Sequence, residues 1–372
     1  MPLRVLIDGI AYGNSTQRGI QRYFQETFSR LGRTEQVDLW LRQGVHGELP
    51  QHCRALEPRT GYYPRRRDLW GCVQAARLWR RCRRDFGKYD IFHSMFYTRP
   101  LVPGPAEVVT VYDMIPERLP GLCYWTGCVE DVEEKRKAIA SAAVCLAISE
   151  ATAAEVRAFY PEAAGKVRVI YPGADHLVRR GGTGVKVGES AGRLCADEYV
   201  LFVGDRQGYK NFDRVLEALL DPHWPPGVLL VLVGRAWALQ EALLVKRLGL
   251  STRVRHLGVV TDEQLRRAYR EARCFVFPSL GEGFGFPLLE AQSMGCAVAC
   301  SDIPVFRETA GDSAEYFDPH AAASLAGAVA RLMDDGVRAE QRRRHAANVA
   351  RFSWDRCASQ TLEAYREVAA RM

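Results

Sequence analysis

Long apolar runs, paired cysteines and several common catalytic signatures are missing from this sequence. No apolar run reaches the roughly 18–20 residues that a transmembrane helix requires. Residues 1–9 enter a strand-like segment directly and lack the apolar region of a signal peptide, so we expect a cytoplasmic protein. The 11 cysteines are odd in number and form no CxxC pair. This pattern argues against disulfides and zinc sites and favours reduced, buried thiols, so we expect no metal.

The sequence also lacks the motifs of P-loop nucleotide-binding enzymes and of serine hydrolases. The sequence contains no phosphate-binding P-loop and no Ser-His-Asp order with a nucleophile elbow. The polar glycine loop at residues 8–20 does not match GxGxxG, so it is weak evidence for a dinucleotide. Nucleotide chemistry in this chain therefore has to be sought in other loops.

Positive charge is concentrated in one segment of a chain whose net charge is +7. Between Arg65 and Arg84 there are eight arginines, interleaved with Trp70 and Trp79. One interpretation is a solvated basic helix; the other is attraction to anionic lipid headgroups or a pyrophosphate-linked acceptor at the inner face of the cytoplasmic membrane. Nucleic-acid binding is disfavoured because no recognised nucleic-acid module accompanies the charge.

The order of elements predicts an α/β protein with two domains. With 372 residues the chain exceeds what one core usually supports. Strand-like and helical segments alternate through residues 1–175 and again through 198–352, and residues 176–197 have the composition of a linker. Repeated βα units imply two parallel sheets covered on both faces. Such sheets bind ligands at the carboxyl ends of their strands.

The segment Pro278–Glu290 combines a glycine loop with two carboxylates. It follows an apolar strand, and Gly283 and Gly285 let a ligand approach the backbone closely. Pro287 suits the first turn of a helix, whose free N–H groups and dipole favour a phosphate. Neither Glu282 nor Glu290 is well placed for phosphate, so we expect each to accept hydrogen bonds from sugar hydroxyls. The implied ligand is a nucleotide carrying a sugar.

A second motif, Val203–Phe212, also lies between a strand and a helix. Arg206 and Lys210 are expected to project into the same crevice as the Glu282 loop. Two fixed cations there would neutralise a diphosphate as the sugar departs. The alternative is that Lys210 starts a helix and Arg206 forms a surface ion pair.

Residues of the N-terminal half are candidates for the other wall of the site. The loop at residues 8–20, which contains Gly13 and Asn14, is expected near the transferred sugar unless it is an ordinary βα loop. Asp113 ends a predicted strand and is a candidate to hold an acceptor hydroxyl or act as a base; capping a loop is the alternative. His93, which follows the preceding strand, is a weaker candidate.

The motifs, taken in order, resemble family 4 glycosyltransferases, which are retaining enzymes of the GT-B architecture. The resemblance extends over nearly the whole chain and is greatest to the mannosyltransferase-like subgroup of O-antigen and exopolysaccharide synthesis. Its most specific part is the E-x7-E signature formed by Glu282 and Glu290. The motifs that carry it are Gly19–Tyr23, Val111–Glu117, Ile148–Glu150, Val203–Phe212, Val231–Gly234, His256–Gly258, Pro278–Gly295, Arg307–Asp312, Phe317–Pro319 and Phe352–Trp354.

The resemblance implies a role for each motif. Arg206 and Lys210 would bind the donor diphosphate, Glu282 and the Gly283–Phe286 backbone the transferred sugar, and Glu290 the ribose. The backbone set comprises Gly283, Phe284, Gly285 and Phe286. Residues after Gly258, starting with Val259, would flank the base, and residues 353–372 would form a helix packing back on the N-terminal domain.

One departure from the family concerns residue 112. The family usually has His-Asp where this chain has Tyr112-Asp113. Tyr112 donates one hydrogen bond but supplies no imidazole proton near neutral pH. The absence of a DxD motif argues against metal-bound diphosphate, so no cofactor is expected.

We therefore expect a retaining hexosyltransferase with a nucleoside-diphosphate sugar donor and a glycan or lipid-linked acceptor. GDP-mannose is the first choice of donor and UDP-glucose or another UDP-sugar the next. The alternatives are a sugar-nucleotide epimerase, a phosphorylase, or a non-catalytic scaffold that binds sugar nucleotides.

Overall fold

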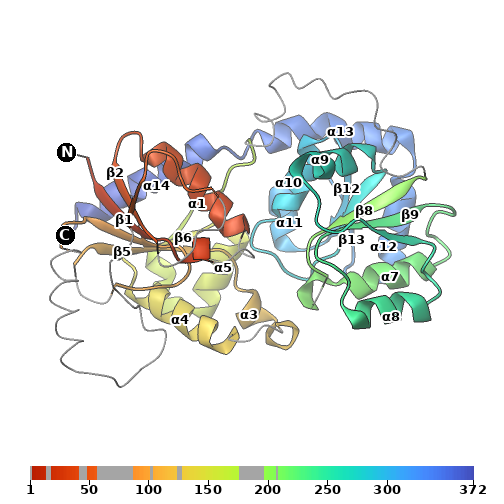
Figure 1. Ribbon diagram of the computed structural model, residues 1–372, viewed down its shortest axis with the longest axis horizontal. Coiled ribbons are helices and arrows are strands. Elements are labelled where there is room, and N and C mark those ends of the chain that lie inside the picture. Colours follow the sequence, from red (N-terminus) through yellow and green to blue (C-terminus); the bar gives the residue numbers. More distant parts are fainter. Residues whose placement is uncertain are drawn as a thin grey trace. The chain divides into compact units, whose positions relative to one another are not determined.

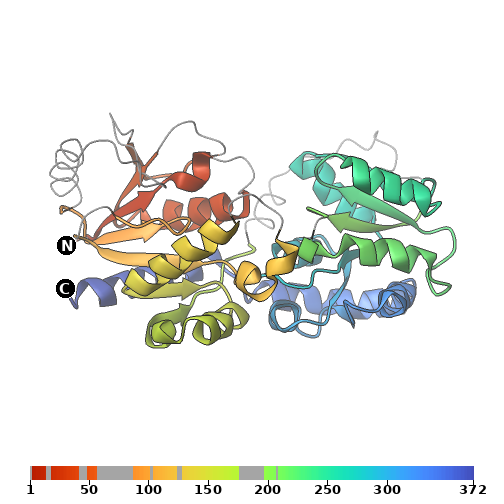
Figure 2. The same cartoon turned by 90° about the horizontal axis from the view of Figure 1, so that it is seen from below.

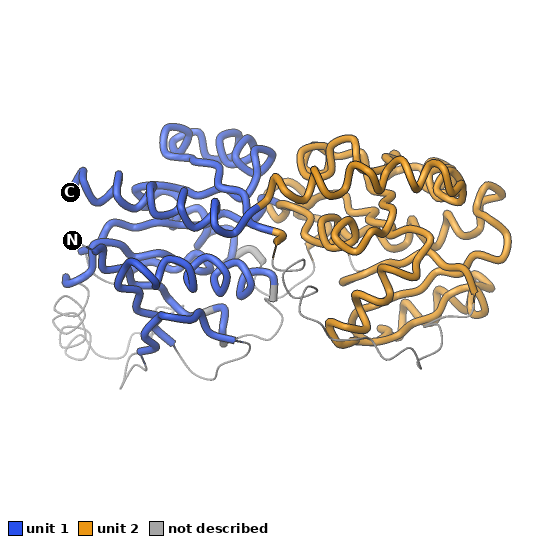
Figure 3. The backbone as a smooth tube through the Cα atoms, turned by 90° about the horizontal axis from the view of Figure 1, so that it is seen from above, with its two compact units in different colours: residues 1–114, 125–173, 353–372 blue, residues 115–124, 174–352 orange. Residues whose placement is uncertain are grey.

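The computed structural model describes residues 2–13, 18–41, 48–56, 87–100, 104–123, 128–175, 197–206 and 208–372. Asn14, the basic segment 65–84 and nearly all of the predicted linker lie outside these residues, so the expectations that concern them stay predictions. The chain divides into two compact units, drawn in different colours in Figure 3. Unit 1 comprises Met1–Met114, Trp125–Gly173 and Ser353–Met372, and unit 2 comprises Ile115–Tyr124 and Ala174–Phe352.

Unit 1 is built on a seven-stranded sheet with the order β3-β2-β1-β4-β5-β6-β7. Every neighbouring pair of strands is parallel, which agrees with the βα alternation of the sequence. The edge strand β3 was not predicted, because its three residues Arg-Ala-Leu carry no apolar alternation. The strands are β1 (Arg4–Asp8), β2 (Gln36–Trp40), β3 (Arg54–Leu56), β4 (Ile91–Ser94), β5 (Ala106–Val111), β6 (Val144–Ala147) and β7 (Val167–Val169).

Helices cover both faces of this sheet. Figure 1 shows α1 (Arg18–Leu31) and α14 (Trp354–Ala369) on one side, and α4 (Cys128–Ser141) and α5 (Glu150–Phe159) on the other. Alternate residues of β5 face these two layers. Val109 and Val111 join the apolar cluster that includes residues of α4 and α5, whereas the Thr110 hydroxyl lies 2.8 Å from His93, whose ring also contacts Tyr365 of α14.

The C-terminal helix α14 completes the core of unit 1. Trp354, at its first turn, is fully buried and lies edge-on to Tyr23 of α1. Gly173 passes so close to this helix that a Cβ there would lie 2.2 Å from the Trp354 backbone nitrogen. Chain segments more than 300 residues apart in sequence therefore share one core, and both termini belong to unit 1 (Figure 3).

Unit 2 contains a six-stranded parallel sheet with the order β10-β9-β8-β11-β12-β13. Its strands are β8 (Tyr199–Val203), β9 (Leu229–Val233), β10 (Val254–His256), β11 (Cys274–Phe277), β12 (Ala297–Ser301) and β13 (Glu315–Phe317). Both sheets thus have the open parallel form expected from the sequence, and Figure 2 shows each with helices around it. The centre of the order, between β8 and β11, is where ligand sites of such sheets lie.

The helices of unit 2 also form two layers. Alternate residues of β11 face opposite sides: Val276 packs in the core under α7 (Phe212–Leu220) and α12 (Ala322–Arg331), whereas Phe275 and Phe277 contact Tyr269 and Phe306. The latter two belong to the layer of α9 (Asp262–Glu271), α10 (Phe286–Ser293), α11 (Pro304–Ala310) and α13 (Asp335–Val349). Helix α8 (Leu239–Arg247) follows β9.

One short segment belongs to a different unit from the one predicted. Residues 1–175 were expected to form a single N-terminal domain, but α3 (Ile115–Arg118) and the turn Pro120–Leu122 group with unit 2. The reason is local packing: Arg118 Nη2 donates a hydrogen bond to the Leu280 carbonyl at 3.1 Å.

Two further findings concern expectations from composition. No helix in the described part of the chain is long and apolar enough to cross a membrane. The structure describes seven cysteines as free thiols, and five of them are buried, as expected from their apolar surroundings.

Candidate functional site

The glycine loop predicted to hold phosphate connects β11 to α10 in unit 2. Gly285 is the N-cap of α10 with φ 95°, and Pro287 lies in the first turn. A Cβ on Gly285 would lie 3.1 Å from Phe306 and 3.2 Å from Leu288, so both backbone and packing exclude other residues. Because α10 follows β11 directly, its N-terminus and the positive end of its dipole lie at the carboxyl edge of the sheet.

Lys210 and Glu282 meet at this edge. The Lys210 ammonium lies 2.6 Å from Glu282 Oε1, and the Ser279 hydroxyl donates to the same oxygen at 2.8 Å. Both side chains are largely buried, with 20% and 12% of their surfaces exposed. Burial alone would lower the pKa of Lys210, but the neighbouring Glu282 carboxylate outweighs it, and the pKa is raised. Lys210 is therefore a permanent cation at neutral pH.

Backbone contacts hold the loops of these two residues together. The Leu280 amide donates to the Tyr209 carbonyl at 2.8 Å. Asn211 has φ 56°, and its side-chain amide donates to the carbonyls of Pro278 and Pro319. The β8–α7 and β11–α10 loops thus form one connected surface, as expected from their shared position in the sheet.

The other predicted donor-binding residues of unit 2 occupy three environments. Glu290, on α10, is partly buried, and Tyr269 donates to its carboxylate at 3.5 Å. Phe284 is 2% exposed and lies edge-on to Phe286 and Phe352, and Gly283 is buried, so a role for their backbones in holding the sugar stays a prediction. Val259, after β10, is 68% exposed and free to contact a flat ring.

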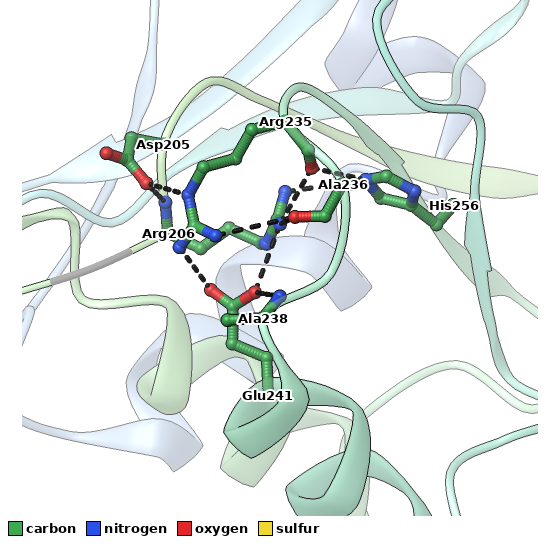
Figure 4. A network of polar contacts seen from close by, with 7 residues as sticks. All are labelled: Asp205, Arg206, Arg235, Ala236, Ala238, Glu241 and His256. Carbon is green, nitrogen blue, oxygen red and sulfur yellow. Dashed lines mark hydrogen bonds and ion pairs between the residues drawn. The ribbon is translucent and has the colours of Figure 1, made fainter.

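Arg206 contacts the segment after β9, whereas Lys210 contacts Glu282, and the expectation that both cations project into one crevice stays a prediction. The Arg206 side chain is fully buried, and Nη2 donates to the carbonyls of Arg235 and Ala236 and to Glu241 at 2.8, 2.9 and 3.1 Å (Figure 4). Its guanidinium carbon lies 5.1 Å from the centre of the Trp237 ring. Arg206 thus ties the β8–α7 loop to the β9–α8 loop, and its role as a diphosphate ligand stays a prediction.

A second arginine completes this network. Arg235 donates to Asp205 at 2.8 Å through Nε and to Glu241 at 2.8 Å through Nη2. Two guanidinium groups thus face two carboxylates, so the cluster is close to neutral (Figure 4). The Lys210–Glu282 pair is balanced in the same way, so the α10 N-terminus supplies the remaining positive potential at this edge.

His256, at the end of β10, borders the same network. Burial and the neighbouring Arg206 lower its pKa, so the ring is neutral at pH 7 and donates from Nε2 to the Arg235 carbonyl at 2.9 Å. Sequence reasoning missed Glu241, Arg235 and Asp205. Glu241 stands in the first turn of a predicted helix, where an acidic residue is ordinary, so only the fold reveals its partners.

The acceptor-side candidates belong to unit 1. The Tyr112 hydroxyl donates to the Met95 carbonyl at 3.0 Å, and burial raises its pKa well above 10. The Asp113 carbonyl accepts from Lys135 at 3.0 Å, and its side chain is partly buried. Gly13 ends a short 3-10 helix, Ile10–Gly13, after β1. Tyr112 is therefore a neutral donor already bonded to its own unit, which agrees with the expectation that it supplies no proton near pH 7.

Comparisons with known proteins decide the family. Residues 18–176 match "Glycosyltransferase Family 4", and residues 193–352 match "Glycosyl transferases group 1". The chain belongs to the family 4 glycosyltransferases. This confirms both the resemblance found in the sequence and the expected enzyme class.

The curated relatives match only part of this chain, whereas two similar solved structures cover 98–100% of it. O-antigen chain mannosyltransferase B of Escherichia coli is 35% identical over 181 residues, 47% of this chain and 47% of that protein. The chain thus matches about half or less of the length of such curated relatives. Sucrose-phosphate synthase of Thermosynechococcus elongatus has a TM-score of 0.74 at 18% identity and covers 100% of both chains. Anabaena HepE, solved with UDP and glucose, has a TM-score of 0.69 at 17% identity, over 98% of this chain and 100% of its own. These structures confirm the fold of two parallel-sheet domains found in GT-B glycosyltransferases.

Proposed function

We propose that this protein is a retaining glycosyltransferase of cell-surface polysaccharide synthesis. It would move a hexose, mannose in the first instance, from a nucleoside-diphosphate sugar to a glycan or lipid-linked acceptor. The observation that carries the proposal is the contact between Lys210 and Glu282 beside the N-terminus of α10. A fixed cation, the positive end of a helix dipole and a carboxylate are groups that suit a diphosphate and a sugar.

Each group has a separate task in this proposal. Lys210 Nζ carries three N–H donors, so it can bind phosphate while one donor remains with Glu282. Lys210 and the helix N-terminus stabilise the charge that develops on the departing diphosphate. Glu282 accepts from hydroxyls of the transferred sugar, and Glu290 from the ribose. Arg206, which is paired with Glu241, holds the β8–α7 loop against the segment after β9.

The reaction is a front-face displacement that needs no metal. The bond between the anomeric carbon and the β-phosphate oxygen breaks, and a bond to the acceptor oxygen forms on the same face. The proton of the acceptor hydroxyl passes to the released diphosphate. Tyr112 takes no part in proton transfer because its pKa is too high.

Mannose is favoured because several relatives are named mannosyltransferases, including the Escherichia coli protein that is 35% identical over 181 residues. UDP-glucose is the second candidate, since HepE, with a similar fold, was also solved with UDP-glucose. The position next to Val259 is where the base would lie, and its open surface suits either purine or pyrimidine.

A donor panel tests the proposal. Purified protein is incubated with GDP-mannose, UDP-glucose and other GDP- and UDP-sugars, with and without glycan acceptors and with EDTA. Binding is followed by thermal shift and transfer by release of the nucleoside diphosphate. Transfer from one donor class, undiminished by EDTA, is expected. Binding without transfer or hydrolysis with any acceptor would instead identify a non-catalytic scaffold.

A further inference from the structure

Glu241 receives hydrogen bonds from three residues of unit 2, which lie in two different loops. Its Oε2 accepts from the Ala238 amide at 2.8 Å and from Arg206 Nη2 at 3.1 Å, and its Oε1 accepts from Arg235 Nη2 at 2.8 Å. The carboxylate is 14% exposed. One side chain thus closes the first turn of α8 and fixes the loops that follow β8 and β9 (Figure 4).

Loss of the Glu241 carboxylate would affect the charge balance of Arg206 more than that of Arg235. Arg235 is 36% exposed and has a second carboxylate, Asp205, at 2.8 Å. Arg206 has no solvent exposure, and Glu241 is its carboxylate partner, the other acceptors being two carbonyls. Its Nε finds no partner among the described residues. A buried guanidinium that loses its countercharge is costly, so removal of the Glu241 charge would force Arg206 to move.

Movement of Arg206 would reach Lys210 through a short loop. Three residues separate them in sequence, and Arg206 and Lys210 are paired with Glu241 and Glu282, respectively. A Cβ on Gly234 would lie 2.4 Å from the Gly204 carbonyl oxygen and 3.6 Å from Arg206 Nη1, so the turns after β8 and β9 lie against each other and only glycine fits at position 234. Lys210 follows in the same connection between β8 and α7.

We propose that Glu241 is a positioning residue of the donor site, acting through Arg206 to hold the β8–α7 loop in its binding conformation. The inference rests on the proposed function, because it concerns the same nucleoside-diphosphate sugar. Glu241 need not touch the donor itself. Its charge, and not only its hydrogen bond to α8, is what the site requires.

The test compares Glu241→Gln with Glu217→Gln in the full-length protein. Gln at position 241 keeps an acceptor for the Ala238 amide but removes the countercharge of Arg206. Glu217, on α7, is 51% exposed and paired with Arg214, so the control makes the same change of net charge away from the network. The measurements are donor KM and kcat, the Kd for GDP and UDP by calorimetry, and the thermal unfolding midpoint.

The expected result for Glu241→Gln is a rise of about tenfold or more in donor KM and nucleoside-diphosphate Kd, with a smaller fall in kcat. Glu217→Gln is expected to leave all three within about twofold of wild type. A lower unfolding midpoint for Glu241→Gln with unchanged KM and Kd would overturn the inference, since Glu241 would then stabilise α8 only. If Glu241→Gln does not fold, Glu241→Asp is measured instead: it keeps the countercharge of Arg206, so donor KM and nucleoside-diphosphate Kd are expected within about twofold of wild type, and a rise of about tenfold would overturn the inference.

Failure of this inference is distinguishable from failure of the proposed function. If the wild-type protein binds the donor and transfers the sugar, and Glu241→Gln has the same KM and Kd, only the role of Glu241 is contradicted. Wild-type protein that neither binds a nucleoside diphosphate nor transfers a sugar contradicts the proposed function itself.

Discussion

Lys210 and Glu282, 72 residues apart in the chain, form a 2.6 Å ion pair beside the N-terminus of α10. The pair joins the two loops that sequence reasoning assigned to the donor diphosphate and to the transferred sugar. Glu282 raises the pKa of Lys210 although the burial of Lys210 works in the opposite direction. The cation is thus available to a phosphate across the physiological pH range.

Loss of the Lys210 charge should weaken binding of phosphates specifically. Lys210→Met is expected to raise the Kd for GDP or UDP about tenfold or more and to leave the corresponding nucleosides unaffected, because only the diphosphate contacts the ammonium. Isothermal titration calorimetry measures both. Lys246→Met, at an exposed position of α8, is the control for lost charge. Equal weakening of nucleoside and nucleoside diphosphate would contradict the assignment.

Gly285→Ala should destabilise unit 2. The position requires φ 95° and is crowded by Phe306 and Leu288, so a cost of about 1–3 kcal/mol is expected. Gly327→Ala is the matched comparison, because Gly327 lies within α12 with ordinary space around it. That change should stabilise the protein by up to about 1 kcal/mol. Urea unfolding measures the change in unfolding free energy of each variant, which is expected to have opposite signs. Equal changes would be inconsistent with a strained N-cap at Gly285.

Trp354→Ala should show that α14 is part of the unit 1 core. Trp354 is fully buried against α1 and Gly173, so its truncation is expected to cost about 3–5 kcal/mol. Phe159, at the end of α5, is 43% exposed, and Phe159→Ala should cost less than about 1 kcal/mol. Chemical denaturation compares the two aromatic truncations. Similar costs would mean that α14 adds little to the core.

His93 should make the protein less stable in mild acid. Burial lowers its pKa from 6.5 to about 3, and its ring lies between Thr110 and Tyr365. The folded state therefore excludes a proton that the unfolded chain binds. The His93 contribution is complete above pH 6.5 and is lost as pH falls toward 3, by about 2–3 kcal/mol at pH 4.5.

The His93→Gln variant isolates this effect. Gln does not titrate, so the variant should lose less unfolding free energy than wild type between pH 7.5 and 4.5. His223→Gln, with a 71% exposed side chain, should keep the wild-type dependence. Identical pH dependence in wild type and His93→Gln would rule out His93 as the source.

Local sequence patterns foresaw the elements but not every contact. The strand at 274–277, the glycine loop and the helix with Pro287 in its first turn follow from apolar runs and glycine and proline positions, and the structure has them. The shared edge of Lys210 and Glu282 followed from the rule that parallel strands carry their ligand sites at one end.

Contacts that depend on distant segments could not be predicted. The local sequence predicts that Arg206 is a charged loop residue. Its partners in the structure are Glu241, 35 residues later in the chain, and two backbone carbonyls. Residues 115–124 group with unit 2, and Arg118 among them bonds to a carbonyl 162 residues away. Nothing in either local pattern specifies such a partner.

The most direct test of the account is the rate of sugar transfer by Glu282→Gln relative to wild type, with the best donor of the panel. We predict that the variant folds and has an unfolding midpoint near that of wild type. Its transfer rate should be lower by about a hundredfold or more, because the carboxylate that holds the sugar is lost. Full transfer activity in Glu282→Gln would contradict the assignment of this site.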